Sequence, residues 1–315
     1  MSSINRFYPK ASKKEASLLK KDIKRCYYKY LTTSDEYFLF DFHKNKSPHY
    51  RASFLTDNFK IRCLLKTISE EKYVNDLSDK YNFYKIASPF FGRSAMCVDS
   101  STIFNNFEIF TSEHFDLFIK PLSDSFGRGA RVVVLKSAKE IKELFDELTS
   151  YGTWIVEERI HQCEETMQWN TSSVNTVRLP CFLSNGNFYV LGPFFRTGRK
   201  GAVVDNAGGG GIFACINPQT GEIVSDGVDE MNRYYERHPD SGLVFKGWRV
   251  PRWDELLALA EKVFTQCFHT HRYIGFDFAL TDKGWVLIEG NWGQFVGQYN
   301  DKQGVKEEFV RYLNS

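Results

Sequence analysis

The stretch Tyr273–Gln294, YIGFDFALTDKGWVLIEGNWGQ, has the pattern that decides the fold. Apolar and aromatic residues alternate with polar ones on both sides of TDKG, which is a turn signal, so the pattern predicts a β-hairpin. We expect residues 282–284 to form a three-residue loop with Gly284 in the left-handed conformation. Thr281 then pairs with Trp285, and every later pair follows from that register.

The predicted register gathers polar side chains on one face of the hairpin. Counting outward from the loop, Asp277 falls directly opposite Glu289. Side chains alternate across a strand, so Asn291 shares the face of Glu289. The other face is apolar and holds Phe276, Phe278, Val286 and Ile288.

Two directly opposed carboxylates repel each other unless a positive charge lies between them. A hard divalent cation is one candidate, because Mg²⁺ takes oxygen ligands, commonly one or two protein carboxylates together with waters and phosphate oxygens, and an Asn carbonyl can join them. Asp277, Glu289 and Asn291 are therefore candidate metal ligands. A solvated sheet face whose acids are balanced by Lys or Arg fits the spacing as well, and the rest of the chain has to decide.

Length and composition are those of an ordinary globular protein. The 315 residues are enough for two or three packed subdomains, and 42% hydrophobic and 25% charged residues fit a substantial core. A formal net charge of +2 argues against a dedicated nucleic-acid binder, which usually has a strong basic excess. Local basic sites for a small anion stay open.

The cysteines and the apolar runs predict a cytoplasmic protein. The seven cysteines are scattered and never spaced as CxxC, which favours reduced thiols over disulfides or a zinc site. The opening MSSINRFYPKASKKE does not resemble a secretion signal. No run approaches the roughly 18 apolar residues of a membrane span.

Two regions of different character follow each other along the chain. Residues 1–79 are rich in Lys, Glu, Leu and Tyr with helical spacing, as in KKEASLLKKDIKRCYYKYL, and predict a helical N-terminal region. Its interleaved Lys and Tyr could touch nucleic acid or a membrane surface, although a charged outer helix face explains them too. From Lys80 onward, short aromatic and β-branched strands are joined by turns such as SNGN. This pattern predicts an α+β fold with largely antiparallel sheets.

Segment 115–135, FDLFIKPLSDSFGRGARVVVL, is a candidate anion site. Lys120 ends a strand, and the glycine-containing loop after it can turn its N–H groups toward phosphate oxygens. The loop lacks the GxxxxGK[ST] pattern of a P-loop, and an ordinary hairpin explains it as well. Further on, TWIVEERI ends in Glu157 and Glu158, with Glu165 beyond. A strand edge here could hydrogen-bond an adenine and a Glu could hold ribose hydroxyls, unless the strand simply runs into a polar loop.

The order of these parts resembles the ATP-grasp superfamily. A lysine strand, a glycine loop, a strand with paired Glu, an Arg-bearing strand, and then Asp and Glu-x-Asn on terminal strands follow each other from Lys80 to the C-terminus. The segments SVNTVRL, FFRTGRKGAVVDNAGGGG, INPQTGEI and FDFAL…IEGN look most like the sugar-transfer-associated branch, which is linked to polysaccharide biosynthesis. The resemblance implies an ATP-grasp domain over residues 80–315, in which two α+β subdomains clamp ATP. The helical N-terminal region departs from the usual α/β domain that precedes such a core.

The resemblance also implies roles for individual residues. Lys120 contacts the ATP phosphates, which a flexible loop covers. The loop residues are Ser125, Gly127, Arg128 and Gly129. The residues at the adenine hinge and the ribose are Glu157, Glu158, Ile160 and Glu165. Asp277, Glu289 and Asn291 match the ligands of Mg²⁺ bound to ATP, which favours the metal interpretation of the hairpin.

Three arginines and a turn indicate where the acceptor binds. Arg178, Arg196 and Arg199 lie on or beside strands between the two ATP-binding halves, and a guanidinium suits a carboxylate or a developing phosphate charge. They are the candidate catalytic residues. Asp205 and Asn206 precede a glycine run, where a bare backbone can approach a ligand. With Arg196 and Arg199 they are the candidate substrate-binding residues, unless Arg199 is merely solvated in a turn.

Most ATP-grasp enzymes phosphorylate a carboxylate, and an amine then attacks the acyl phosphate to form an amide. The resemblance therefore implies an ATP- and Mg²⁺-dependent carboxylate–amine ligase, joining an amino acid or amine to a sugar acid of a surface polysaccharide such as a capsule. This chemistry needs charge neutralisation at the transferring phosphoryl group and no protein nucleophile. Two alternatives stay open. One is a kinase that phosphorylates a hydroxyl with Asp205 as base, and the other is a non-catalytic nucleotide-binding partner of a glycosyltransferase assembly.

Overall fold

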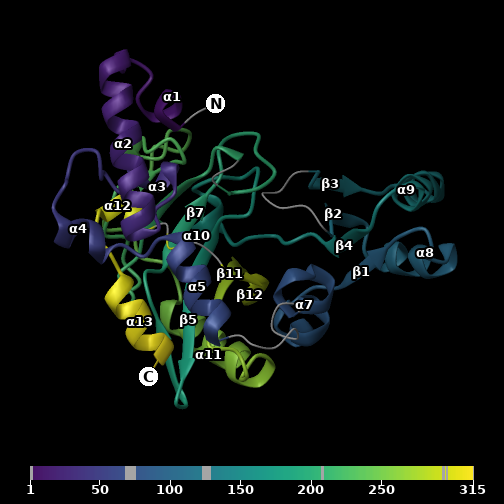
Figure 1. The fold of residues 1–315 in the computed structure, drawn as a ribbon. Coiled ribbons are helices and arrows are strands. Elements are labelled where there is room, and N and C mark those ends of the chain that lie inside the picture. The colour runs from purple at the N-terminus through teal and green to yellow at the C-terminus, as the bar shows by residue number, and fades with distance from the viewer. Residues whose placement is uncertain are drawn as a thin grey trace.

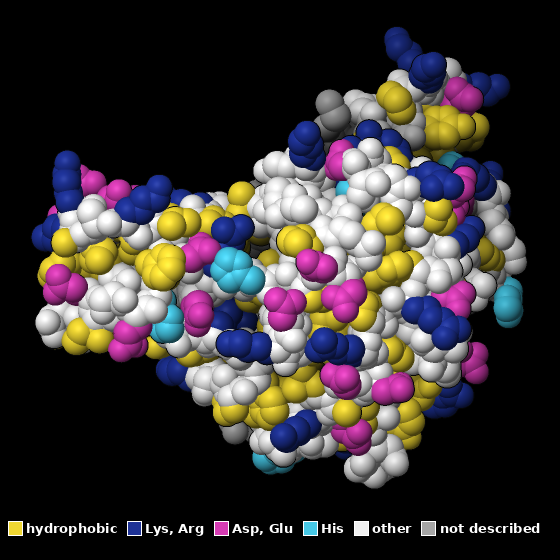
Figure 2. Space-filling model, turned by 180° about the vertical axis from the view of Figure 1, so that it is seen from behind, with side chains coloured by type: hydrophobic (Ala, Val, Ile, Leu, Met, Phe, Trp, Pro, Cys, Tyr) yellow, Lys and Arg dark blue, Asp and Glu magenta, His cyan; other side chains and the backbone are white. Residues whose placement is uncertain are grey.

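The computed structural model describes residues 3–67, 76–122, 129–206, 209–292, 295 and 297–314. These residues form an α+β fold with a smaller lobe that projects from a larger body (Figure 1). Each lobe is built on its own antiparallel sheet. Seen from behind, the smaller lobe stands off the body across a hollowed junction (Figure 2).

The smaller lobe is a sheet covered by two helices. Its described strands lie in the order β1 (Ala95–Val98), β4 (Trp154–Glu158), β2 (Asp116–Pro121) and β3 (Arg131–Val134). The covering helices are α8 (Phe104–Glu113) and α9 (Ala138–Ser150). Leu144 and Leu148 of α9 pack on Leu117 and Ile119 of β2 in a separate apolar core. Because alternate β2 residues point the other way, Lys120 is turned out of this core.

The body is built on a second sheet. Its described strands lie in the order β10 (Tyr234–Tyr235), β9 (Gly227–Val228), β8 (Ile212–Cys215), β7 (Phe194–Thr197), β5 (Thr176–Ser184), β11 (Tyr273–Thr281) and β12 (Gly284–Asn291), with β6 (Asn187–Val190) paired to β5. The helices and short turns around it are α7 (Lys80–Ala87), η1 (Ser88–Phe90), α10 (Glu164–Met167), α11 (Trp253–Cys267), α12 (Gly297–Asp301) and α13 (Lys306–Asn314). Helix α7 contacts β1 of the smaller lobe as well as β12 and α11 of the body, so it links the two.

The hairpin predicted from residues 273–294 is formed by β11 and β12. Asp277 lies opposite Glu289, as predicted. The turn is one residue tighter than predicted, since Thr281 pairs with Gly284 and Leu280 with Trp285. A bulge between Asp277 and Phe278 compensates for this shift, so the predicted register returns beyond it.

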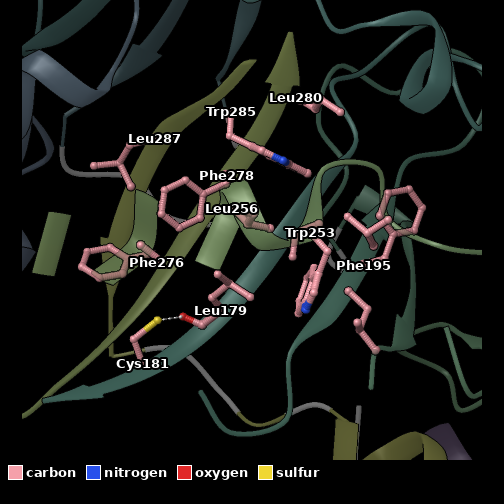
Figure 3. Packing of buried hydrophobic residues seen from close by; sticks show 14 of the residues in the cluster. Leu179, Cys181, Phe195, Trp253, Leu256, Phe276, Phe278, Leu280, Trp285 and Leu287 are labelled. Carbon is pink, nitrogen blue, oxygen red and sulfur yellow. Dashed lines mark hydrogen bonds between the residues drawn. The ribbon is translucent and has the colours of Figure 1, made fainter. Parts of the chain in front are cut away.

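The bulge changes which residues of β12 face the core. Trp285 and Leu287 lie on the apolar side with Phe276 and Phe278, whereas the predicted Val286 and Ile288 do not (Figure 3). Ile288 lines the cavity described below instead. On the apolar side, Gly290 lets Phe83 of α7 approach so closely that a Cβ atom at residue 290 would lie 2.5 Å from its ring. The hairpin therefore supports α7 with one face and presents polar groups with the other.

The described N-terminal residues are helical. The helices are α1 (Ser3–Phe7), α2 (Lys13–Tyr30), α3 (Ser34–Leu39), α4 (Pro48–Ser53) and α5 (Asp57–Thr67). Helix α2 begins at a capping box of Ser12 and Glu15. The aromatic cluster under these helices, which includes Phe38 and Phe40, also contains Phe194 and Phe213 of the large sheet. These helices are thus packed onto the body.

The cysteines and the described helices can be compared with the sequence predictions. All seven cysteines are free thiols, and Cys26, Cys163, Cys181 and Cys215 are buried. Within the described ranges, none of the helices combines the length and apolar character needed to cross a bilayer.

Candidate active site

A cavity of about 1010 Å³ lies between the smaller lobe and the body. Lys120 and Glu157 line it from the smaller lobe, and the polar face of the hairpin lines it from the large sheet. Its volume is at the upper end of the range for small-molecule sites, which is roughly 300–1,000 Å³. The cavity therefore has room for a nucleotide together with a second substrate.

Asp277 is the most buried charged group of this cavity, with a relative exposure of 0%. Arg178, its direct neighbour on β5, donates from Nε and Nη2 to the two carboxylate oxygens, the second bond being 2.6 Å long. Arg196 on β7 donates from Nη2 to Oδ2 at 2.8 Å. Burial opposes ionisation, but the positive charges of Arg178 and Arg196 outweigh it and lower the pKa of Asp277. Asp277 is thus a charged carboxylate between two guanidinium groups.

Glu289 and Asn291 lie nearer the open space of the cavity. About a third of the Glu289 side chain, 35%, is exposed, and its Oε1 lies 3.9 Å from Arg178 Nη2. Burial and the negative charge of Asp277 raise the pKa of Glu289. The Oδ1 atom of Asn291 accepts from Arg178 Nη1 at 2.9 Å. Arg178 therefore joins all three predicted metal ligands into one cluster.

The cluster fits a magnesium ion in part. Glu289 presents a cavity-facing carboxylate with an unfavourable negative neighbour, and a cation beside it would relieve that repulsion. Asn291 can supply a carbonyl oxygen next to it. Asp277 has both oxygens occupied by arginine, so in this arrangement the arginines balance its charge. Across the described ranges, no group of three or more His, Cys, Asp or Glu side chains is placed to hold a metal ion.

Lys120 faces this cluster from the smaller lobe and is held by Glu157. Its Nζ lies 2.9 Å from Glu157 Oε1, and Arg93 Nη2 lies 3.0 Å from Glu157 Oε2. Burial works against the Glu157 charge, but Arg93 and Lys120 outweigh it and lower its pKa to about 2. The pair of cations exceeds the single anion, so this wall keeps one net positive charge for an anionic ligand.

The depressed pKa of Glu157 predicts a stability change with pH. A carboxylate whose pKa falls from 4.5 to about 2 on folding stabilises the fold fully above pH 4.5, and loses that contribution as pH falls through 2. The shift corresponds to about 3 kcal/mol for this nearly buried side chain. Glu157→Gln should therefore be less stable than the unmodified chain at about pH 5. This difference in unfolding free energy should become smaller as pH falls. Denaturant titrations at about pH 5 and about pH 3 measure it, and a constant gap would contradict the role of the ion pair.

Asp205 and Asn206 also line the cavity, next to the arginines. Asp205 accepts a hydrogen bond from Thr176 Oγ1, and its Oδ2 lies 3.6 Å from Arg196 Nε. Burial raises its pKa, although Arg196 opposes this effect. Arg196 therefore connects Asp205 with Asp277.

Ten of the predicted site residues line this cavity. They are Lys120, Glu157, Ile160, Arg178, Arg196, Asp205, Asn206, Asp277, Glu289 and Asn291. Arg199 is not among the lining residues, and its Nε donates to Asp240 at 2.9 Å. Three described residues that were predicted to bind the nucleotide do not line the cavity either. They are Gly129, Glu158 and Glu165. The predicted loop residues Ser125, Gly127 and Arg128 lie outside the described residues.

The cavity contains residues that sequence reasoning did not single out. Arg93, which fixes Glu157, stands alone between FFG and SAM, and no spacing marks it. At the other end, the N-terminal helices contribute Arg6, Asp35 and Glu36. Burial raises the pKa of Glu36 to about 7. Only the capping-box pattern at Thr33 would have drawn attention to this segment.

Comparison with known proteins gives a family and several solved structures. A family model described as sugar-transfer associated ATP-grasp matches residues 62–309. Among curated proteins the sequence has no significant match.

Three similar solved structures are distant from this chain in sequence. D-alanyl-alanine synthetase A from Vibrio cholerae is 13% identical, with 76% of this chain and 65% of that chain covered and a TM-score of 0.44. The ATP-grasp ligase PsnB, complexed with a phosphomimetic precursor variant, Mg and ADP, is 12% identical, with 78% and 60% covered and a TM-score of 0.45. N5-carboxyaminoimidazole synthetase from Staphylococcus aureus, complexed with ADP, is 10% identical, with 70% and 46% covered and a TM-score of 0.44. This chain thus spans less than two thirds of the length of each.

Proposed function

The chain belongs to the sugar-transfer-associated ATP-grasp family, and from this premise we propose that it is an ATP- and Mg²⁺-dependent ligase that joins a carboxylate to an amine. The γ-phosphoryl group of ATP is transferred to a carboxylate oxygen of the first substrate. The amine then attacks the acyl carbon, the C–N bond forms, and phosphate leaves with that oxygen. In this proposal the carboxylate belongs to a sugar acid of a surface polysaccharide, and the reaction takes place in the cytoplasm.

One observation supports this function best: cationic side chains from both lobes face a single cavity that also contains Glu289 and Asn291. Transfer of a phosphoryl group needs its charge neutralised and its partners aligned, and needs no protein nucleophile. Lys120 approaches from the smaller lobe, and Arg178 and Arg196 approach from the large sheet. Cationic side chains from both lobes thus line the space in which phosphate and carboxylate would meet.

The chain's own residues then have separable tasks. Lys120, kept in place by Glu157, binds phosphate oxygens of ATP. Arg196, with Asp205 beside it, orients the acceptor carboxylate. Glu289 and Asn291 would hold Mg²⁺, and Asp277 would support them through Arg178. When bound, the ion would neutralise charge on the transferring phosphoryl group.

Isotope transfer tests the proposed reaction. A panel of sugar acids labelled with ¹⁸O in the carboxylate is incubated with ATP, Mg²⁺ and a panel of amines. We expect ADP release that requires both substrates, with the label appearing in inorganic phosphate and an amide as the product. Release of ADP without any labelled phosphate, in the presence of a productive acceptor, would contradict the acyl phosphate.

Lys120→Ala should weaken ATP binding by roughly tenfold or more, because a phosphate oxygen loses a charged hydrogen-bond donor. Glu157 keeps Arg93 as its partner in this variant, so the fold should be retained. Calorimetric titration with ATP measures the affinity, and Lys139→Ala on the exposed face of α9 is the matched control. Equal affinity of the Lys120 variant and the control would show that Lys120 does not touch the nucleotide.

Asp205 favours one alternative function, phosphorylation of a hydroxyl acceptor. It faces the cavity, and burial raises its pKa, as suits a general base. A kinase would give a stable phosphorylated acceptor and ADP, without an amine requirement. The same product analysis therefore separates the kinase from the ligase.

A further inference from the structure

Helix α2 carries a concentration of positive charge that the cavity does not use. Its sequence KKEASLLKKDIKRCYYKY contains seven Lys and Arg against two Asp and Glu. Its net charge of +5 exceeds the +2 of the whole chain, so the remaining residues together carry −3. All residues of α2 are described, and none lines the cavity.

The basic side chains of α2 point away from the protein. Ala16, Leu19, Ile23 and Cys26 pack toward the aromatic cluster under the N-terminal helices. All seven Lys and Arg residues of the helix are exposed. Of the two acids, Asp22 is engaged by Arg51 at 2.6 Å. The other, Glu15, is occupied by the capping box at the beginning of the helix.

The outward stripe of α2 mixes charge with apolar surface. Lys14, Leu18, Lys21, Arg25 and Tyr28 follow each other at intervals of three and four residues, so they lie along one side of the helix. Leu18 is 59% and Tyr28 is 71% exposed. Among the described side chains, no carboxylate forms an ion pair with Lys14, Lys21 or Arg25. The stripe therefore combines positive charge with exposed Leu and Tyr side chains, as helices that lie on membrane surfaces do.

The position of α2 leaves this stripe accessible. The helix lies at the upper edge of the body, away from the smaller lobe (Figure 1). From behind, dark blue Lys and Arg side chains stand out at that end, with yellow hydrophobic ones between them (Figure 2). A large, flat partner could therefore reach the stripe.

We propose that the outward stripe of α2 docks the protein on an anionic lipid surface. Clusters of Lys and Arg on an amphipathic helix are attracted by negatively charged headgroups, and Tyr and Leu beside them fit the interface between headgroups and acyl chains. A nucleic acid offers phosphates but little for the exposed Leu18 to bury against, so the apolar part of the stripe favours the lipid surface. The proposal stands independently of the reaction in the cavity.

Vesicle binding by the full chain tests the proposal. Cosedimentation is measured with neutral phosphatidylcholine vesicles and with vesicles containing about 30% phosphatidylserine, at about 0.1 M salt. We expect binding to the anionic vesicles only, and a loss of most of it at about 0.5 M salt. Each basic residue near such a surface strengthens binding about fivefold, so Lys21→Gln/Arg25→Gln should weaken it by about 25-fold.

The matched control neutralises as many exposed charges elsewhere. Lys139→Gln/Arg249→Gln removes two basic side chains that are 83% and 71% exposed on other elements, and should bind like the unmodified chain. Tyr28→Ala should weaken binding while leaving its salt dependence unchanged, because it removes apolar contact and no charge. If a charge variant does not fold, the salt titration of the unmodified chain still tests the proposal.

Several outcomes would overturn the proposal. One is equal binding to neutral and anionic vesicles. A second is a control variant that loses as much vesicle binding as Lys21→Gln/Arg25→Gln. A third is a chain that does not bind vesicles but binds single-stranded RNA through Lys21 and Arg25. Self-association of the chain through α2, seen by sedimentation without vesicles and abolished in Lys21→Gln/Arg25→Gln, would also overturn it if vesicle binding is absent.

Discussion

Glu289→Gln should lower the turnover of the proposed reaction by about a hundredfold or more. The substitution keeps the shape of the side chain and removes the charge that faces the cavity next to Asn291. An ion at this position would be held less tightly, and the transferring phosphoryl group would be less well neutralised. A loss of a few kcal/mol in transition-state stabilisation corresponds to that factor. ADP release at saturating substrates measures it.

The same substitution should leave the ligand-free fold as stable as before, or more stable. Burial and the charge of Asp277 raise the pKa of Glu289, so its ionised form opposes folding. A raised carboxyl pKa means that stability falls as pH rises through it, and Glu289→Gln should remove that fall. Melting with and without Mg²⁺ and ATP provides a readout besides activity. The exposed Glu143→Gln is the control.

Either of two results would contradict the metal role of Glu289. One is full activity of Glu289→Gln together with an unchanged Mg²⁺-dependent shift in melting temperature. The other is inactivity that arises only because the ligand-free variant has unfolded. In both cases the acidic face would be a structural feature of the sheet.

The hairpin could be predicted from sequence because its information is local. Strict alternation fixed which residues share a face, and TDKG fixed where the chain turns, so Asp277 was correctly placed opposite Glu289. The tighter turn and the bulge between Asp277 and Phe278 cancel each other in the register at this pair. They do not cancel for Ile288, which points into the cavity, because a bulge inserts one residue without any mark in the apolar pattern.

The partners of Asp277 could not be predicted, because they depend on which strands become neighbours. Sequence reasoning considered a metal ion or balancing Lys and Arg for the opposed acids. The structure brings Arg178 beside Asp277 through the pairing of β5 with β11, and Arg196 follows on β7. The pairing of strands far apart in sequence is set by the packing of the whole sheet, not by spacing within either strand. The approach of the N-terminal helices to the cavity also depends on packing between distant parts of the chain, so it could not be predicted either.

Arg178→Met should destabilise the fold by about 3–5 kcal/mol at neutral pH, since it removes one partner of a buried ion pair. The guanidinium is the donor to both oxygens of Asp277 and to Asn291. Without it, a carboxylate of 0% exposure keeps only Arg196 as a cationic hydrogen-bond donor among the described residues. Denaturant unfolding of the ligand-free chain measures the loss, so the result does not depend on the identity of the substrates.

Two comparisons show whether the loss comes from the charge of Asp277 or from packing. Arg196→Met should cost less, because Asp277 then keeps its two bonds to Arg178. Adding Asp277→Asn to Arg178→Met should restore most of the stability, because the unpaired buried charge is gone while Arg196 keeps an acceptor.

The loss of stability caused by Arg178→Met should also become smaller as pH falls. In the unmodified chain the depressed pKa of Asp277 means that its stabilisation is lost in acid, whereas in the variant protonation relieves the buried charge. A loss that persists unchanged in the double variant and at low pH would show that Arg178 acts through its packing, and that the cluster beneath the proposed metal site is not held together by charge.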